Sequence, residues 1–367
     1  MNEFITVKEI ARQTLPRLID NLVFPNLVHK DYSNDFVTGK GAKIQVKKPV
    51  VLKAEEFDES TGVKAQDIKE QSVEVALDKL ATVDIEFGAI EGATNVDDIN
   101  RLFAEPAAVA LAEKINRDGL ELYKDIPYVA GTAGTTPSSL SDIAAVRKAL
   151  NEQKVPVAGR VAVWDTEADS KFTTIDAIVN AEKSGSTQAL REGSIGRVFG
   201  LDNYMSQAVK THKKGTLSAA VKPKAAVKAG ATTLTLAATA VTGTLVKGDI
   251  LTILNDTYVV KSDATADSNE ITVSIYPALK KDITTSTAVA VTGDHTANLA
   301  FNPNAFAFVT RPLAVPSGVD CYVTSYNGIT LRVVRGYNMQ YKKEMLSMDV
   351  LYGYATMYEE LAVRVLG

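Results

Sequence analysis

Apolar residues recur at helical spacing in two stretches of the chain. Residues 6–22 carry an apolar residue every three or four positions, with Pro16 expected to kink or interrupt the helix. The second stretch starts at Pro106, a residue suited to the first turn of a helix, and runs to Ile126 before Pro127. The pattern predicts an N-terminal helical arm and a second helix about 30 Å long. An isolated arm this short is marginal in water, so it needs a partner surface.

Between these helices, polar and apolar positions alternate. Lys43–Lys47 alternates, as does Ser72–Val75, and Thr82–Phe87 continues the pattern less regularly. We expect these runs to form one long β-hairpin, with the acidic stretch Glu55–Gln71 at its tip. Such a hairpin cannot bury both of its faces by itself and must lie on something else.

The middle of the chain mixes helical and strand patterns. Ser139 or Ser141 would cap one helix, and Asp165 or Thr166 would cap another. Val161–Trp164 has the continuous apolar character of a buried strand. This part of the chain is therefore predicted to be α/β.

From about Thr211 to Asn298 the composition changes to Thr, Ala and Val, and aromatic residues nearly vanish. Short strand patterns separated by turn residues indicate a small all-β sandwich or barrel, inserted into another domain. The predicted strands are Thr233–Leu236, Ile250–Ile253, Tyr258–Val260, Ile271–Ile275 and Ala288–Val291. After this region the chain returns to longer strands, from Phe306 to Leu366.

Composition narrows the class of protein. The 367 residues are 46% hydrophobic and 23% charged, which is typical of a soluble protein with two or three compact units. A formal net charge of −4 argues against a protein made for non-specific binding of nucleic acid. Cys321 is the single cysteine, so internal disulfides and a cysteine zinc site are excluded. We expect no secretory signal and no membrane span.

Residues that could carry catalysis are scattered. His29, His212 and His295 fall in three separate segments, and each is expected to be a surface or capping residue rather than a general base. Asp165 and Asp169 suit helix capping better than metal binding. No dinucleotide-binding or Walker motif occurs in the sequence. We therefore predict no enzyme, no catalytic residues, no metal and no cofactor; an enzyme using Asp165 is the weakest alternative.

One charge pattern has two interpretations. Between Asp202 and Asp249 there is no acidic residue, and lysines accumulate at positions 210, 213, 214, 222, 224, 228 and 247. These lysines could contact an acidic partner or nucleic acid. They could equally be solvated residues that keep exposed strand edges from pairing, which is the interpretation we favour.

The order of these elements resembles the major capsid protein of tailed bacteriophages with the HK97-like fold. Asn26–Ser33 followed by Gly41–Pro49 is similar to the arm-to-hairpin segment of the coat-protein branch typified by phage P-22. Arg101–Lys124 is similar to the spine region of that branch. Glycines at positions 193, 196 and 200 resemble a recurrent feature of the capsid A-domain. An inserted β-domain is a further mark of this branch.

The resemblance implies an α+β, HK97-like fold with an inserted small all-β domain. Its expected segments are an N-terminal helical arm (1–40), an extended hairpin or E-loop (41–92), the spine helix of the P-domain (93–130), the A-domain (131–210), the inserted β-domain (211–298) and return strands of the A- and P-domains (299–367). The arm and the hairpin are expected to be covered by neighbouring subunits.

The function implied is that of a shell subunit. Hexamers and pentamers of the chain would close into an icosahedral capsid around double-stranded DNA, held without sequence-specific contact. A scaffolding protein and a portal are the expected partners of a maturing procapsid, assembled in the host bacterial cytoplasm and found in the virion, with no membrane. The alternative in the same fold is an encapsulin-like cellular nanocompartment; a β-rich adhesive protein fits the long helix poorly.

Charge suggests which residues would meet between subunits. We expect contacts between the acidic hairpin tip and basic residues of a neighbour. The assembly-contact candidates are Glu55, Glu56, Asp58 and Glu59 on the acidic side and Lys47, Lys48, Lys213 and Lys214 on the basic side.

Overall fold

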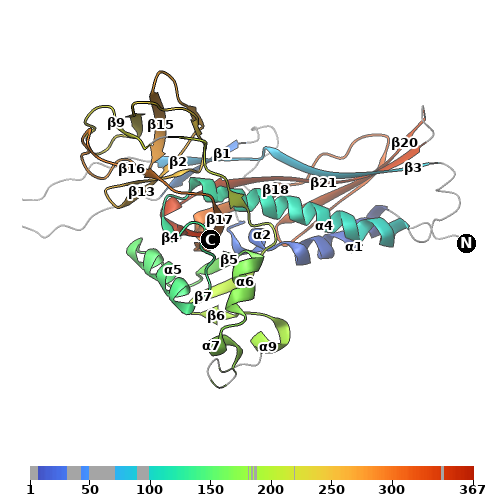
Figure 1. Ribbon diagram of the computed structural model, residues 1–367. Helices are drawn as coiled ribbons and strands as arrows, with labels where there is room; N and C mark the ends of the chain where they lie inside the picture. Colours follow the sequence, from blue (N-terminus) through green and yellow to red (C-terminus); the bar gives the residue numbers. More distant parts are fainter. Residues whose placement is uncertain are drawn as a thin grey trace, which may run out of the picture. The chain divides into compact units, whose positions relative to one another are not determined.

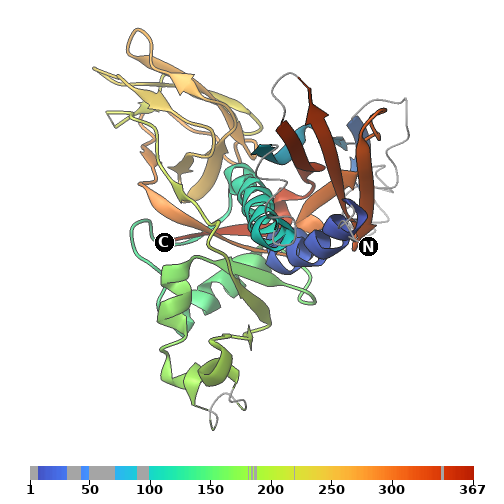
Figure 2. The same ribbon diagram turned by 90° about the vertical axis from the view of Figure 1, so that its right-hand side faces the viewer.

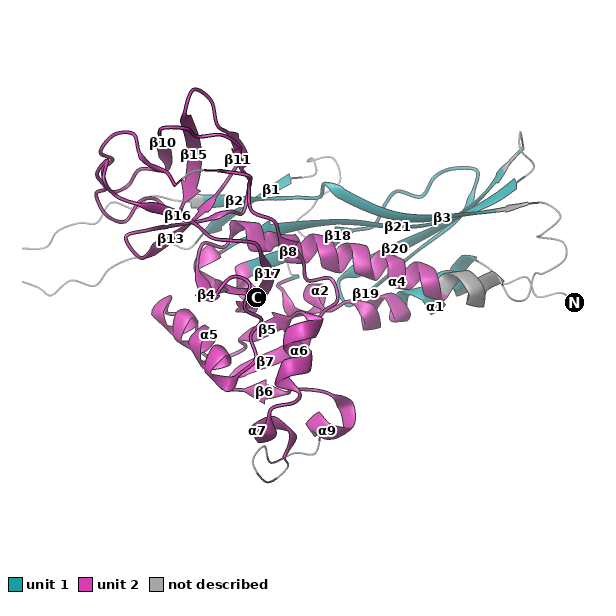
Figure 3. Ribbon diagram, viewed as in Figure 1, with its two compact units in different colours: residues 1–15, 30–104, 306–357 teal, residues 16–29, 105–305, 358–367 magenta. Residues whose placement is uncertain are grey.

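The computed structural model divides into two compact units (Figure 3). It describes residues 7–30, 43–48, 71–88, 99–180, 182, 185, 188–218, 220–339 and 343–367. Unit 1 takes in residues 1–15, 30–104 and 306–357, and unit 2 takes in residues 16–29, 105–305 and 358–367. Neither unit is continuous in sequence.

Pro16, expected to kink or interrupt a helix, and Pro106, expected to begin one, both lie inside helices. The helices are α1 (Val7–Asn21), α2 (Phe24–Leu27) and α4 (Ile99–Leu120), which leads into the 3-10 helix η2 (Glu121–Asp125). The helix α1 continues through Pro16, so of the expected kink or interruption the interruption is wrong, and α4 begins at Ile99 rather than at Pro106. A proline removes one backbone hydrogen bond, and the rest of the ladder continues on either side of it.

Asn116 of α4 is hydrogen-bonded to the turn between α1 and α2, within unit 2. Its side-chain oxygen accepts hydrogen bonds from the backbone N–H of Val23 at 3.0 Å and of Phe24 at 3.2 Å, and its amide donates to Asn21 O at 3.0 Å. Leu18 and Phe24 are fully buried. The expectation that neighbouring subunits cover the arm is therefore wrong for this part, because the partner surface belongs to the same chain.

Unit 1 is built on a five-stranded antiparallel sheet. Its strands are β3 (Lys79–Gly88), β18 (Phe306–Arg311), β19 (Asp320–Tyr326), β20 (Ile329–Asn338) and β21 (Lys343–Thr356). The long strand β21 pairs with β20 and β18 along one edge and with β3 along the other. Alternate residues of β21 are buried, including Met348, Val350 and Tyr352, so one face of the sheet carries the core of this unit.

A two-stranded ribbon joins this sheet. It consists of β1 (Lys43–Lys48) and β2 (Gln71–Ala76), paired antiparallel as the alternation predicted. The third alternating run is β3, which pairs with β21 and not within the hairpin, so the single long hairpin is wrong in this respect. Alternation shows that a segment is a strand but does not identify its partner. Gly353 has no room for a side chain, because Ala76 O occupies the position of its Cβ.

Unit 2 contains a seven-stranded mixed sheet. Its strands are β4 (Val129–Gly131), β5 (Val161–Trp164), β6 (Arg197–Val198), β7 (Leu201–Met205), β8 (Thr211–His212), β17 (His295–Phe301) and β22 (Ala362–Leu366). The order is β4-β22-β17-β5-β7-β6, and β8 pairs with β17. The β22–β4 and β5–β7 pairs are parallel.

Helices α5 (Leu140–Glu152) and α6 (Thr166–Phe172) flank this sheet (Figure 1). Shorter helical turns are α7 (Asp176–Val179), α9 (Gln188–Glu192), η3 (Pro303–Ala305) and η4 (Glu359–Leu361). Ser139 caps α5 and Asp165 caps α6, as predicted. The predicted strand Val161–Trp164 is fully buried, with the Trp164 ring 4.9 Å from that of Phe172.

The segment between β8 and β17, residues 213–294, is a separate β-sheet body that we call the β-module (Figure 2). Its strands are β9 (Lys222–Pro223), β10 (Thr233–Ala237), β11 (Thr244–Leu245), β12 (Ile250–Ile253), β13 (Asp256–Val260), β14 (Ala264–Thr265), β15 (Glu270–Tyr276) and β16 (Val289–Val291). All five strands predicted here are confirmed. The six-stranded sheet runs β16-β12-β13-β15-β10-β9, and a bridge from Val221 to Val289 joins its two ends. The β-module has its own apolar core, which includes Leu234, Tyr258 and Val273.

Candidate self-assembly surface

The β1–β2 ribbon of unit 1 is amphipathic. Ile44 lies opposite Val75, and Val46 lies opposite Val73, so four apolar side chains share one face. Val75 is buried, whereas the other three remain partly exposed. A two-stranded ribbon is marginally stable in water by itself. Its half-covered apolar face is therefore suited to contact with another surface.

The opposite face of the ribbon is polar. Lys43 Nζ lies 2.7 Å from Glu74 Oε1, and both side chains are exposed. The hydrogen bond from Lys43 to Glu74, and the charge of that carboxylate, raise the pKa of Lys43 above its ordinary value. Lys47 projects on this face opposite Ser72. The two faces of the ribbon thus differ sharply in chemistry.

The predicted assembly-contact residues have different outcomes. The acidic set at positions 55, 56, 58 and 59 lies outside the described residues. Lys47 and Lys48 are in β1 of unit 1, and Lys213 and Lys214 are in unit 2 at the base of the β-module. There, Lys213 Nζ lies 3.0 Å from Asp294 Oδ2, and the Lys214 backbone N–H donates to Asp294 Oδ1 at 2.9 Å. The side chain of Lys213 nevertheless stays 76% exposed, so an intersubunit role for it stays a prediction.

The acid-free lysine run has acidic partners elsewhere in the chain. Five of its lysines form ion pairs: Lys210 with Glu121, Lys213 with Asp294, Lys224 with Glu270, Lys228 with Asp282 and Lys247 with Asp125. These carboxylates offset much of the positive charge. The structure therefore favours solvated, paired lysines over a basic surface for nucleic acid.

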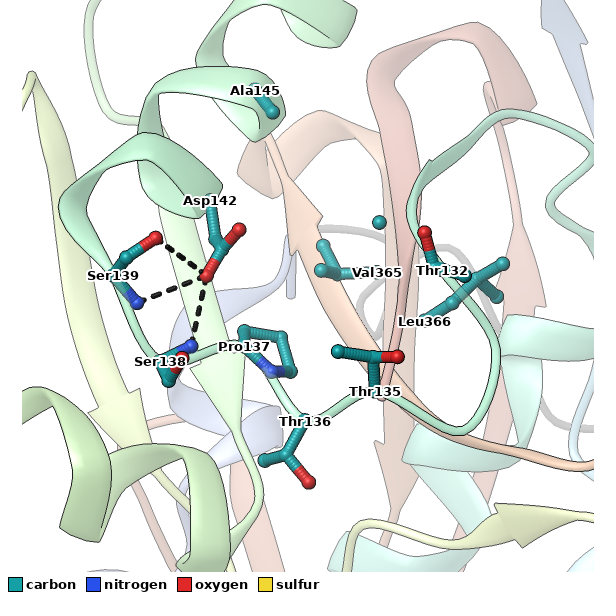
Figure 4. Close-up of a pocket in the computed structure, with 11 residues that line it drawn as sticks. Thr132, Thr135, Thr136, Pro137, Ser138, Ser139, Asp142, Ala145, Val365 and Leu366 are labelled. Atoms are coloured by element: carbon teal, nitrogen blue, oxygen red, sulfur yellow. Dashed lines mark hydrogen bonds between the residues drawn. The ribbon is translucent and has the colours of Figure 1, made fainter.

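A pocket of about 220 Å³ lies at the start of α5 (Figure 4). Asp142 accepts hydrogen bonds there from the backbone N–H groups of Ser138 and Ser139 and from Ser139 Oγ, each at 2.9 Å. Burial alone would raise the pKa of Asp142, but these hydrogen bonds outweigh it and lower the pKa. The chain's own carboxylate thus occupies the position where a helix N-terminus would bind an anion.

The described part of the chain contains no group of three or more His, Cys, Asp or Glu side chains placed to hold a metal ion. Within the same residues, no helix is long and apolar enough to span a membrane.

Sequence reasoning missed a buried polar cluster at the base of the β-module. His212 and His295, expected to be isolated residues at the surface or at caps, face each other across the β8–β17 ladder with ring centres 5.4 Å apart. Both are almost completely buried, together with Asp249 and Arg364. Only the closure of the chain around the β-module brings these residues together, so spacing along the sequence held no signal for the cluster.

Comparison of the sequence finds no matching family model and no matching characterised protein. The structure, in contrast, is similar to solved structures of phages. One is from Mycobacterium phage Che8, with 16% identity and a TM-score of 0.54 over 94% of this chain and 90% of that chain. Another is the capsid structure of cyanophage P-SCSP1u, with 12% identity and a TM-score of 0.52 over 94% of this chain and 88% of that chain.

At these identities the comparison establishes the fold. The chain has a mixed α+β fold that is also found in a phage capsid structure, and the similarity extends over nearly its whole length. The resemblance to phage capsid proteins drawn from the sequence is confirmed at this level.

Proposed function

We propose that this chain is the major capsid subunit of a tailed phage. The observation that carries the proposal is a fold shared with a cyanophage capsid structure over 94% of the chain. In this proposal the fold is HK97-like. The arm is residues 1–40, the E-loop 41–92, the spine segment 93–130, the A-domain 131–210, the inserted β-domain 211–298 and the return strands 299–367.

The ribbon gives a physical reason for self-assembly. Ile44, Val46 and Val73 expose part of an apolar face that the same chain does not fully bury. In a shell, a neighbouring subunit would cover this face and remove it from water, with about 25 cal/mol gained for each Å² of apolar surface buried. The proposed charged contacts around it are the acidic residues Glu55, Glu56, Asp58 and Glu59 and the basic residues Lys47, Lys48, Lys213 and Lys214.

The proposed function also specifies the assembly that the subunit forms, its partner proteins and the compartment in which it assembles. Hexamers and pentamers of the subunit close into an icosahedral shell that holds double-stranded DNA without reading its sequence. A scaffolding protein directs the precursor shell and a portal occupies one vertex. Assembly takes place in the host bacterial cytoplasm, and the mature protein belongs to the virion.

Electron microscopy of the protein produced in bacteria tests this function. With the neighbouring genes of its source genome co-expressed, we expect closed shells of uniform diameter, and tubes or spirals when the subunit is produced alone. Monomers and dimers in both preparations would overturn the proposal. Shells that enclose an enzyme instead of DNA would favour the nanocompartment alternative.

A matched pair of variants tests the role of the ribbon. Val46→Asp places a charge on the apolar face, and Ser72→Asp places the same charge on the polar face. We expect Val46→Asp to lower the yield of shells by more than about tenfold, because the buried carboxylate would have no partner, while the subunit stays folded. Ser72→Asp leaves the apolar face intact and should lower the yield far less, although its charge lies opposite Lys47. Equal yields from the two variants would remove the ribbon from the assembly surface.

A further inference from the structure

The chain enters and leaves the β-module at one place. His212 ends β8 and His295 begins β17, and the two residues are paired in register. Three other side chains gather beside them: Tyr123 from η2, Asp249 from the turn before β12, and Arg364 from β22. We call these five side chains the junction cluster. All of them belong to unit 2.

A chain of hydrogen bonds crosses the cluster. Tyr123 Oη lies 3.1 Å from His212 Nδ1, and His212 Nε2 lies 2.9 Å from Asp249 Oδ1. In the neutral form of the His212 ring, Nε2 donates to the carboxylate and Nδ1 accepts from the tyrosine hydroxyl. Asp249 Oδ2 also accepts the backbone N–H groups of Gly215 at 3.1 Å and Val246 at 2.8 Å. This carboxylate therefore links the β-module directly to β8 and, through the His212 ring, to η2.

Arg364 contacts the same turn of the β-module, at Gly248, next to Asp249. Its Nη1 donates to Gly248 O at 2.7 Å, and its guanidinium carbon lies 4.4 Å from the centre of the Tyr123 ring. The side chain is fully buried, and Nε and Nη2 have no hydrogen-bond partner among the described residues. Burial lowers the pKa of Arg364 to about 9, so the group remains charged at neutral pH.

His295 is neutral in this arrangement. Its Nδ1 donates to Gly293 O at 2.7 Å, which leaves Nε2 as an acceptor without a partner among the described residues. Burial and the charge of Arg364 lower the pKa of His295 to about 4. A proton on this ring would place a second buried cation beside Arg364, and no carboxylate is hydrogen-bonded to His295 in the described structure.

The charged groups around the cluster offset that repulsion only in part. The charge of Asp249 raises the pKa of His295, whereas those of Arg364 and His212 lower it. Asp249 is the carboxylate inside the cluster. It already accepts hydrogen bonds from the His212 ring and from the backbone N–H groups of Gly215 and Val246. At the η2 side, Glu121 pairs with Lys210, and Asp125 pairs with Lys247 at 3.1 Å. These carboxylates therefore have cationic partners of their own.

We propose that the junction cluster is an acid-sensitive lock: with His295 neutral it holds the Gly248–Asp249 corner of the β-module in place, and protonation of His295 beside Arg364 releases that corner while the β-module stays folded. The lock does not depend on the function proposed above. The core of the β-module is separate from the cluster and contains no histidine. Protonation of a histidine would therefore not destabilise that core in mild acid.

Hydrogen exchange on the full-length protein tests the lock. The reporters are the segments that hold the Gly215 and Val246 amides, and the internal reference is the β10–β15 ladder of the β-module. After correction for the intrinsic exchange rate, acidification from about pH 7 to about pH 4 should accelerate exchange at the reporters by about tenfold or more. Exchange in the reference ladder should stay unchanged. Loss of protection in both places together would overturn the proposal.

Two variants separate the lock from general acid sensitivity. His295→Gln keeps a polar side chain that does not become charged, and it should abolish the acceleration. His29→Gln removes a histidine outside the cluster and should behave like the unmodified protein. The same acid response in His295→Gln would overturn the proposal.

A measurement on the unmodified protein makes the test independent of whether the variant folds. Histidine proton resonances titrated by NMR should show one ring whose midpoint lies well below the ordinary 6.5 and coincides with the onset of exchange at the reporters. If exchange accelerates at a pH where no histidine titrates, the lock does not operate.

Discussion

Two arginine–carboxylate pairs cross from β20 to β21, and they differ in how much water reaches them. Arg332 Nε donates to Asp349 Oδ2 at 3.0 Å, and the two side chains are 19% and 4% exposed. Arg335 Nε donates to Glu344 Oε2 at the same distance, with exposures of 45% and 41%. The buried pair also has further hydrogen bonds, since Arg332 Nη1 donates to Ala314 O at 2.9 Å and Asp349 accepts from Ser347 Oγ at 3.0 Å.

Removal of each arginine should therefore have different costs. Arg332→Met leaves the Asp349 carboxylate buried without its cation, which should lower the free energy of unfolding by about 3–5 kcal/mol. Arg335→Met breaks an exposed pair and should lower it by less than about 1 kcal/mol. Urea denaturation of the full-length variants measures both. Equal losses would mean that burial does not set the strength of these pairs.

Acid dependence at His295 follows from the direction of its pKa shift. The pKa is about 4 in the folded chain and 6.5 for an ordinary histidine. Between these values the unfolded chain binds a proton that the folded chain does not, so the free energy of unfolding falls as the pH falls through this window. The loss approaches about 3 kcal/mol below pH 4 and is absent above pH 6.5. Urea denaturation at a series of pH values gives the free energy of unfolding as a function of pH. This dependence should be weaker in His295→Gln than in the unmodified protein. Equal pH dependence in the two proteins would contradict the low pKa of His295.

Among the elements, the β-module has the sheet and the apolar core of a unit that can fold by itself. Its sheet joins end to end through the Val221–Val289 bridge, and its core draws on residues within 217–291. We expect residues 213–294 alone to give a strand-rich circular dichroism spectrum and a single cooperative thermal transition. A disordered spectrum would show that the junction contacts are needed for folding.

Local elements were predictable because their causes are local. The cap of α5, expected at Ser139 or Ser141, is at Ser139, and the buried run Val161–Trp164 is a strand as expected. Both depend only on residues close together in sequence. The partner of β3 was not predictable, because alternation is the same whether a strand pairs with its neighbour in sequence or with β21. The junction cluster was even harder to predict from the sequence, because its five residues come from five segments that meet only in the folded chain.

At the scale of the whole molecule, charge bears on the proposed cargo. The chain carries a formal net charge of −4, and five lysines of its most basic run have acidic partners. Non-specific DNA binding depends on lysines and arginines that displace counterions. The net charge and these ion pairs therefore disfavour non-specific binding of DNA.

We expect the free subunit to bind duplex DNA no more tightly than about 10⁻⁴ M at physiological salt, the weak end of non-specific binding. Fluorescence anisotropy with a short labelled duplex measures this affinity. The double variant Asp282→Asn, Asp294→Asn removes the carboxylates paired with Lys228 and Lys213 and should bind more tightly. Tight binding by the unmodified subunit would show that the acidic partners do not mask the lysines.

The two ends of the β-module lie next to each other, where β8 and β17 pair through His212 and His295 and where Lys213 contacts Asp294. A segment whose ends meet can be exchanged for another folded domain with adjacent termini, because the host strands need not move to accommodate it. The position after His212 is therefore a natural graft point. In the proposed shell, a foreign antigen or enzyme spliced there would be carried once per subunit, so its copy number would be that of the subunits.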